Sequence, residues 1–174
     1  MTRKKWLVAS IIASVLAAVI KLHGYVSENS EKGEIVCSYS VSEDKWTVDP
    51  ENGKLFRHNE INGVGLIIEE RHMGVNYSNI GLNAERMVED MKKTYTSEGM
   101  ICEIGESVEI GGTKWVVLYA ENGEGVKMLQ NTAMQGDGVY IVTYIADEDV
   151  YEVGLSDFQE VLESFEFSEL ISLS

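Results

Sequence analysis

The stretch GVYIVTYIADEDV, from Gly138 to Val150, says most about the fold of this 174-residue chain. Two sets of residues alternate along it: Val139, Ile141, Thr143 and Ile145, and between them Tyr140, Val142 and Tyr144. Successive side chains of a strand point to opposite faces of the sheet. Because both sets are largely apolar, we predict a central strand that is buried on both faces.

The acids Asp147, Glu148 and Asp149 follow this strand and are weak candidates for a metal site. Calcium takes about six to eight oxygen ligands, often from a loop of spaced acids with a glycine. Contiguous acids on an extended chain point to alternate sides, and no glycine follows at the required place. Acids before a helix also stabilise its N-terminus, by about 0.3–1 kcal/mol. We therefore predict no cofactor and interpret the triplet as the exit toward a helix, which begins near Tyr151 or at Ser156.

Strands joined by turn residues dominate the rest of the chain. MICEIGESVEI (100–110), TKWVVLYA (113–120) and VKMLQNTAM (126–134) precede the opening stretch, with glycine-containing turns between them. This spacing predicts an antiparallel meander of four strands. Nearer the N-terminus, EIVCSYSV (34–41) alternates, and shorter strand patterns follow around Trp46 and up to VGLIIEE (64–70).

Two amphipathic helices are expected to cover the sheet. The first follows Asn83, a suitable N-cap, and ends near Gly99, with its apolar stripe at Ala84, Val88, Met91 and Tyr95. The second carries the stripe Leu155, Phe158, Val161, Leu162 and Phe165, and Ser156 with Gln159 has the spacing of a capping box. The predicted class is α+β, with an antiparallel sheet of about six to seven strands flanked by helices, plus an N-terminal hydrophobic helix.

The N-terminus predicts export. Residues 1–24 contain Arg3, Lys4 and Lys5 and then an uncharged run from Trp6 to Ile20. This run is intermediate in length between a signal-peptide core and a membrane span, so a cleaved signal peptide and a retained membrane anchor both remain open. Residues 25–34 are a polar linker, residues 35–167 the folded domain and residues 168–174 a C-terminal tail.

The charge of the chain disfavours one class of partner. Its formal net charge is −15, from 14 basic and 29 acidic residues. Nucleic-acid binding relies on Lys and Arg to displace counterions from phosphates, so nucleic acid is excluded as a partner. The acidic balance leaves open a calcium- or manganese-binding accessory role.

The other reactive residues show no catalytic spacing. Cys37 and Cys102 either form a disulfide in an oxidising compartment or serve as small buried hydrophobes. His23, His58 and His72 lack metal-ligand spacing and are interpreted as solvated loop residues. No GxSxG, Walker or Rossmann pattern occurs, so a small hydrolase is only a distant alternative.

Several of these residues together resemble one family. A first strand with Tyr39, a Trp46 soon after, the strand GGTKWVVLYA, the stretch GVYIVTYIADEDVYEV and a final helix ending in VLESFEF are similar to the PsbP-like proteins. This family includes an extrinsic photosystem II subunit, a Ran-binding transport factor and small exported bacterial proteins. The resemblance covers residues 35–167 and implies a sheet flanked by helices with a binding or assembly role. It implies no site residues, because its members have unrelated partners.

The sequence therefore predicts a non-enzymatic extracytoplasmic domain that is either held at the outer face of the membrane or secreted. Its expected partner is a protein or a cell-envelope component, and its expected contact with the membrane is through the N-terminal segment. An acidic metal-binding protein is the alternative.

Overall fold

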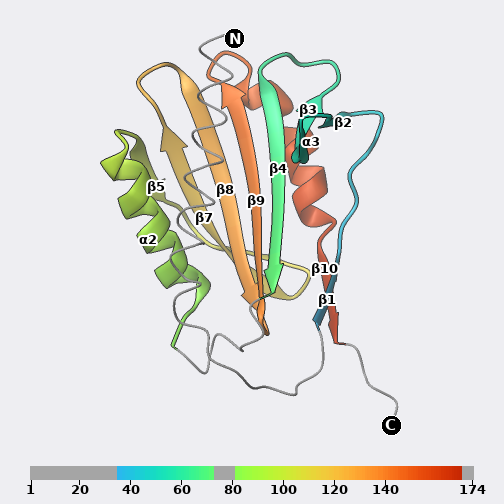
Figure 1. Ribbon diagram of the computed structural model, residues 1–174, viewed down its shortest axis with the longest axis vertical. Helices are drawn as coiled ribbons and strands as arrows, with labels where there is room; N and C mark the ends of the chain where they lie inside the picture. Colours follow the sequence, from blue (N-terminus) through green and yellow to red (C-terminus); the bar gives the residue numbers. More distant parts are fainter. Residues whose placement is uncertain (1–34, 73–80, 170–174) are drawn as a thin grey trace.

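The computed structural model describes residues 35–72 and 81–169 (Figure 1). Within these ranges the chain forms an eight-stranded antiparallel sheet, a separate two-stranded ribbon and two helices. The elements in chain order are β1 (Ile35–Ser38), β2 (Trp46–Asp49), β3 (Asn52–His58), β4 (Val64–His72), α2 (Ala84–Ser97), β5 (Ile101–Ile104), β6 (Val108–Ile110), β7 (Thr113–Glu121), β8 (Val126–Gln135), β9 (Gly138–Asp147), α3 (Tyr151–Glu163) and β10 (Glu166–Glu169). The predicted α+β class is confirmed.

Strand β9 lies in the middle of the sheet, as predicted. The strand order is β2-β3-β4-β9-β8-β7-β5, and β6 pairs with the same edge of β7 as β5 does. Along its whole length β9 pairs with β8, and from Gly138 to Ala146 it also pairs with β4. Every residue from Gly138 to Ala146 is buried. A strand with two apolar faces needs cover on both sides, and α3 packs directly on one of them.

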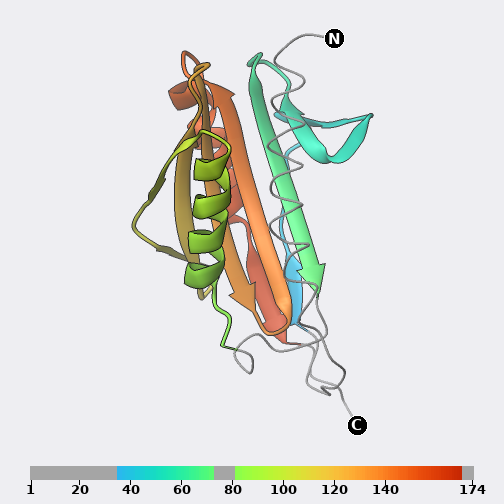
Figure 2. The same cartoon turned by 60° about the vertical axis from the view of Figure 1, so that its left-hand side comes forward.

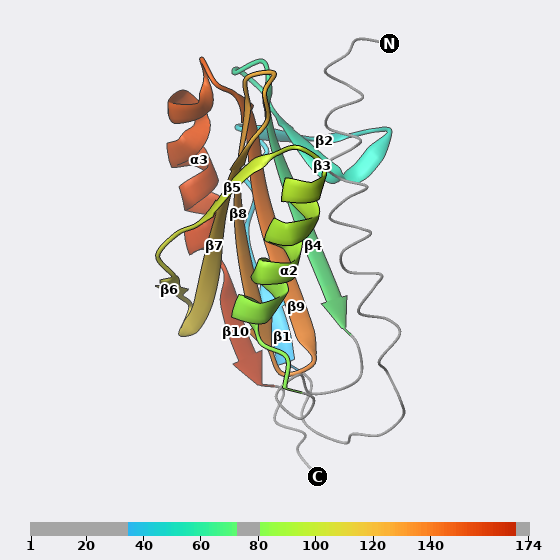
Figure 3. The same cartoon turned by 90° about the vertical axis from the view of Figure 1, so that its left-hand side faces the viewer.

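The helices pack on opposite faces of the sheet (Figure 3). On one face, the buried stripe of α2 packs mainly on β5, β7 and β8 and belongs to the same core cluster as the β9 residues Val139, Ile141 and Ile145. On the other face, the stripe of α3 packs with Tyr140, Val142 and Tyr144. The alternation along β9 therefore supplies one residue set to each core. The side chain of Asn83 accepts a hydrogen bond from the backbone N–H of Arg86, which confirms the predicted N-cap of α2.

The sheet contains more strands than the six to seven predicted, partly because residues 100–110 do not form one strand. The chain breaks after Ile104 and resumes as β6 at Val108. The break includes Gly105, where a Cβ would lie 2.6 Å from a ring carbon of Tyr119, so a larger residue would not fit here. β5 and β6 then pair in succession with different parts of β7.

Helix α3 begins at Tyr151, so the capping box expected at Ser156 is wrong. Ser156 lies inside the helix. The earlier start places Tyr151 in the core, where its carbonyl oxygen accepts a hydrogen bond of 2.8 Å from the hydroxyl of Tyr144. The acids Glu148 and Asp149 come just before this N-terminus, which favours negative charge.

Strands β1 and β10 form the ribbon outside the main sheet. β10 continues to Glu169 and so includes the first two residues of the segment predicted as a tail. Aromatic contacts attach the ribbon to the core: Tyr39 stacks on Phe165 at 4.7 Å, and Phe167 meets Tyr140 edge to face at 4.8 Å. At the other end, the β2–β3 hairpin stands away from the long strands (Figure 2).

The predicted signal peptide or anchor and the linker, residues 1–34, lie outside the described residues. Among the helices that the structure does describe, none has the length and apolar character needed to cross a membrane.

Candidate functional site

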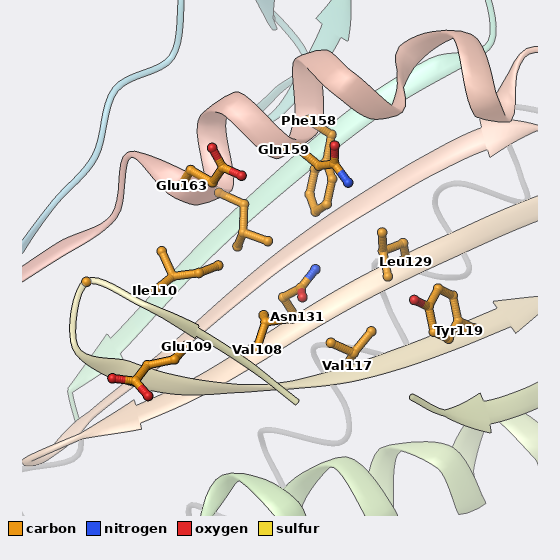
Figure 4. A pocket seen from close by; sticks show the side chains of 12 residues that line it. Val108, Glu109, Ile110, Val117, Tyr119, Leu129, Asn131, Phe158, Gln159 and Glu163 are labelled. Atoms are coloured by element: carbon orange, nitrogen blue, oxygen red, sulfur yellow. The ribbon is translucent and has the colours of Figure 1, made fainter. Parts of the chain in front are cut away.

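A groove of about 510 Å³ lies between α3 and strands β6, β7 and β8 (Figure 4). Pockets of roughly 300–1,000 Å³ commonly hold ligands. Its lining residues are Val108, Glu109, Ile110, Gly111, Val117, Tyr119, Leu129, Asn131, Phe158, Gln159, Leu162 and Glu163.

The position of α3 explains why the sheet is open here. α3 packs mainly against β9 and β4. A helix is about 10 Å across and strands lie about 4.8 Å apart, so one helix covers roughly two strands. The same face of β8 and β7 is therefore left with Leu129 and Val117 as an apolar floor, and Phe158 of α3 forms the inner wall.

Asn131 is the one buried amide in this floor. It projects from β8 beneath α3, between Val117 and Leu129 (Figure 4), and is 2 % exposed. Its Nδ2 has no hydrogen-bond partner among the described residues. An unpaired buried donor costs about 1–3 kcal/mol. Asn131 is therefore placed to donate to an acceptor bound in the groove.

The neighbouring amide, Gln130, shows the contrasting case. It points to the opposite face of β8 and is fully buried. Its Oε1 accepts from the hydroxyl of Tyr95 at 2.9 Å, and its Nε2 donates to Sδ of Met91 at 2.9 Å and to Oγ1 of Thr132 at 3.4 Å. The two adjacent buried amides thus differ in their hydrogen bonding. Gln130 has partners inside the core, whereas Nδ2 of Asn131 has none among the described residues.

The rim of the groove is acidic and partly apolar. Its charged lining residues are Glu163 of α3 and Glu109 of β6, and the side chain of Glu109 points to the opposite face of the sheet, where Lys114 is its neighbour. Val108 is 40 % exposed and Tyr119 is 46 % exposed, so the groove opens toward solvent along β6 and β7. Gln159 contributes a second amide from α3 (Figure 4).

The structure does not gather the three acids of the triplet into one cluster. The carboxylate of Asp147 lies against Gly63, Glu148 is ion-paired with Lys127 at 3.1 Å, and Asp149 is exposed. Within residues 35–72 and 81–169, no group of three or more His, Cys, Asp or Glu side chains could hold an ion. The interpretation of the triplet as the exit from β9 toward α3 is confirmed by the start of α3 at Tyr151.

Cys37 and Cys102 are free thiols, so the predicted alternative of a disulfide is not what the structure shows. Cys37 packs on the α3 face of the sheet and Cys102 on the α2 face, and the sheet separates them. Burial, together with the charge of Glu70, raises the pKa of Cys37 to about 12. Burial also raises the pKa of Cys102. Both thiols therefore contain little of the nucleophilic thiolate.

His58 is buried, which corrects the prediction of a solvated loop residue. Its side chain is 4 % exposed. Its Nδ1 accepts hydrogen bonds from the backbone N–H groups of Glu60 and Ile61, so the ring proton lies on Nε2 and is donated to Asp157 at 2.8 Å. Lys45, at 2.6 Å, and His58 together lower the pKa of Asp157. Both ring nitrogens of His58 therefore form hydrogen bonds within the fold.

His72 is solvent-exposed, as predicted, and lies between two carboxylates. Its Nε2 is 2.8 Å from Glu70 and its Nδ1 is 3.3 Å from Asp137. Glu70 and, to a lesser degree, Asp137 raise the pKa of His72. Because the two carboxylates approach different nitrogens, they do not share one point with the ring where an ion could bind.

The groove is not predicted by any pattern in the sequence. One pattern does point to Asn131: VKMLQNTAM places two amides, Gln130 and Asn131, next to each other in a largely apolar strand. Adjacent residues of a strand face opposite ways, so one amide had to enter each core. Which of the two lacked a partner depended on Tyr95 and α3, far away in the chain.

Comparison with known proteins supports the fold. No family model matches the chain, and no curated protein matches its sequence. Among solved structures, cyanobacterial PsbP (CyanoP) from Synechocystis is 13 % identical, with a TM-score of 0.51, over 82 % of this chain and 98 % of that one.

Two further structures are similar. LpqN of Mycobacterium tuberculosis, described as involved in cell envelope biogenesis, is 11 % identical, with a TM-score of 0.54, over 80 % of this chain and 87 % of that one. A Bacteroides thetaiotaomicron protein is 13 % identical, with a TM-score of 0.50, over 80 % of this chain and 50 % of that one. The protein therefore has a PsbP-like fold.

Proposed function

We propose that this protein is a non-enzymatic, extracytoplasmic accessory domain that binds a protein or a cell-envelope component in the groove beside α3. The observation that carries the proposal is the unpaired Nδ2 of Asn131 in the floor of that groove. An unsatisfied buried amide lowers stability, since an apolar residue of similar size avoids the cost. A bound acceptor gives this amide its missing partner.

Two further observations support the extracytoplasmic setting. The basic residues and apolar run of residues 1–24 are typical of an export segment. The structurally similar LpqN is described as involved in cell envelope biogenesis. A role at the envelope is consistent with both.

The chemistry of the described side chains favours binding over catalysis. A nucleophile needs a positioned base and a lowered pKa. The two thiols have raised pKa values, and the ring of His58 is fully engaged. A metal-binding role lacks a ligand cluster within residues 35–72 and 81–169.

Site-specific photocrosslinking tests the proposal. A benzophenone amino acid at Val108, on the rim of the groove, is expected to give a discrete crosslinked product in living cells that produce the full-length protein. Val48 on β2 is the matched control, because it is a similarly exposed valine at the opposite edge of the sheet. Equal crosslinking from the two positions, or none from Val108, would overturn the proposal.

A further inference from the structure

The groove also indicates what kind of ligand it takes, an inference that rests on the proposed function. We propose that the ligand is an extended segment of a partner protein that combines apolar side chains with Lys or Arg. Three features of the groove lead to this class: its shape, its charge and its unpaired amide.

The apolar surface is long and narrow. From Val108 it continues past Tyr119 to Ile101, which is 69 % exposed. Tyr119 pairs with Glu103 of β5 and Ile101 pairs with Glu121, so both lie on the α3 face of the sheet. Because β7 rises about 3.3 Å per residue, this strip extends roughly 20 Å along the strand. That length matches an extended peptide of about six residues.

The charge around the strip favours a basic ligand. The charged side chain that lines the groove from α3 is the acidic Glu163, whereas Glu109 pairs with Lys114 and points to the opposite face of the sheet. Glu103 adds a second carboxylate on the α3 face, beside Tyr119. Lys127 is on the same face of β8, but it is ion-paired with Glu148 at 3.1 Å. An anionic ligand would be repelled here, whereas each Lys or Arg of a peptide gains an exposed ion pair.

The unpaired amide distinguishes a peptide from an acyl chain. Nδ2 of Asn131 needs an acceptor in the apolar floor, and the carboxylates on the rim disfavour a charged one. A peptide backbone supplies a neutral carbonyl at every residue. An acyl chain supplies only methylene groups at this depth. Recognition by backbone hydrogen bonds combined with side-chain pockets is common for extended peptides.

Peptide selection tests the inference. A phage-displayed library of random nine-residue peptides is selected on the immobilised full-length protein, and the enriched sequences are synthesised. We expect apolar residues at alternate positions with Lys or Arg between them. The Asn131→Val variant is expected to raise the Kd by about tenfold. Glu163→Gln should raise it a few-fold and reduce its dependence on salt, whereas Glu160→Gln, on the same helix but paired with Lys45, should not.

The outcomes separate the ligand class from the proposed function. Acidic or uncharged enriched peptides, or equal affinity for the wild type and Asn131→Val, would overturn the peptide inference. So would the finding that monoolein, a neutral acyl probe, binds in the groove and displaces the selected peptides. In these cases a crosslink specific to Val108 would leave the proposed function standing. No peptide enrichment together with no crosslink from Val108 would contradict both.

Discussion

Nε2 of His58 lies 2.8 Å from Oδ2 of Asp157 and joins the β2–β3 hairpin to α3 across 99 residues of sequence. We expect Asp157→Ala to lower the free energy of unfolding by about 1–3 kcal/mol, because the Nε2–H group is then buried without an acceptor. Urea denaturation measures this change. Glu160→Gln is the control: Glu160 also pairs with Lys45 but is 63 % exposed, so its loss should cost about 0.5 kcal/mol or less. Equal effects of the two substitutions would show that the His58 contact does not stabilise the fold.

Replacing the two adjacent amides of β8, Asn131 and Gln130, by apolar residues should change the stability of the protein in opposite directions. Asn131→Val is expected to raise the free energy of unfolding by about 1–2 kcal/mol, because it removes an unpaired buried donor. Gln130→Leu is expected to lower it by about 1–3 kcal/mol, because it leaves the buried hydroxyl of Tyr95 without its acceptor. Chemical denaturation of both variants checks the pair.

The first of these changes separates function from stability. If Asn131 serves a ligand, Asn131→Val should be more stable and yet bind selected peptides less tightly. A variant that is destabilised, with no change in peptide affinity, would show that Asn131 has a structural role instead.

The fold could be predicted largely because its signals are local. The two-sided apolar pattern of β9 and the N-cap at Asn83 both appear in short windows of sequence, and the structure confirms them. The predictions that were wrong concern features where residues far apart in the sequence come into contact. The first turn of α3 is bound by the hydroxyl of Tyr144, and the break after Ile104 contains Gly105, which lies close to the ring of Tyr119.

The candidate site is less predictable for the same reason. The groove exists because α3 lies over β9 and β4 and leaves β7 and β8 open, which no short stretch of sequence specifies. The burial of His58 likewise depends on Asp157, which comes much later in the chain. Residue type alone made both histidines look like solvated loop residues. Both lie at the ends of strands, and only His72 is solvent-exposed.

The state of the cysteines can be tested directly. The full-length chain, unfolded in guanidinium without reductant and treated with iodoacetamide, is expected to gain two alkyl groups by intact mass, because both thiols are free. In the native protein, alkylation should be slow, since burial raises the pKa of Cys37 to about 12 and also raises that of Cys102. A chain that reacts only after reduction would contradict the placement of the two residues on opposite faces of the sheet.

His72 should stabilise the folded protein more at low pH than at high pH. Its pKa is raised above the ordinary 6.5 by Glu70 and Asp137, so the protonated ring favours the folded state. The contribution is fully present below about pH 6.5 and is lost as the pH rises through the raised pKa. Because the side chain is 39 % exposed, about 0.2–1 kcal/mol is expected. Thermal unfolding of the wild type and His72→Gln from about pH 5 to 8 should show a difference that shrinks with pH. A difference that grows with pH would contradict this assignment.

Gly111 and Gly112 form the turn between β6 and β7 and should differ in their tolerance of alanine. Both have positive φ, +59° and +72°, so either substitution should cost about 1–2 kcal/mol of backbone strain. A Cβ at Gly111 would also overlap the carbonyl oxygen of Phe165, whereas a Cβ at Gly112 meets no atom within 4 Å. We therefore expect Gly111→Ala to lower the free energy of unfolding more than Gly112→Ala does, as measured by urea denaturation. Because Gly111 also lines the groove, its displaced turn should weaken peptide binding, and Gly112→Ala should leave binding unchanged. Equal losses of stability in the two variants would show that the turn does not press against Phe165.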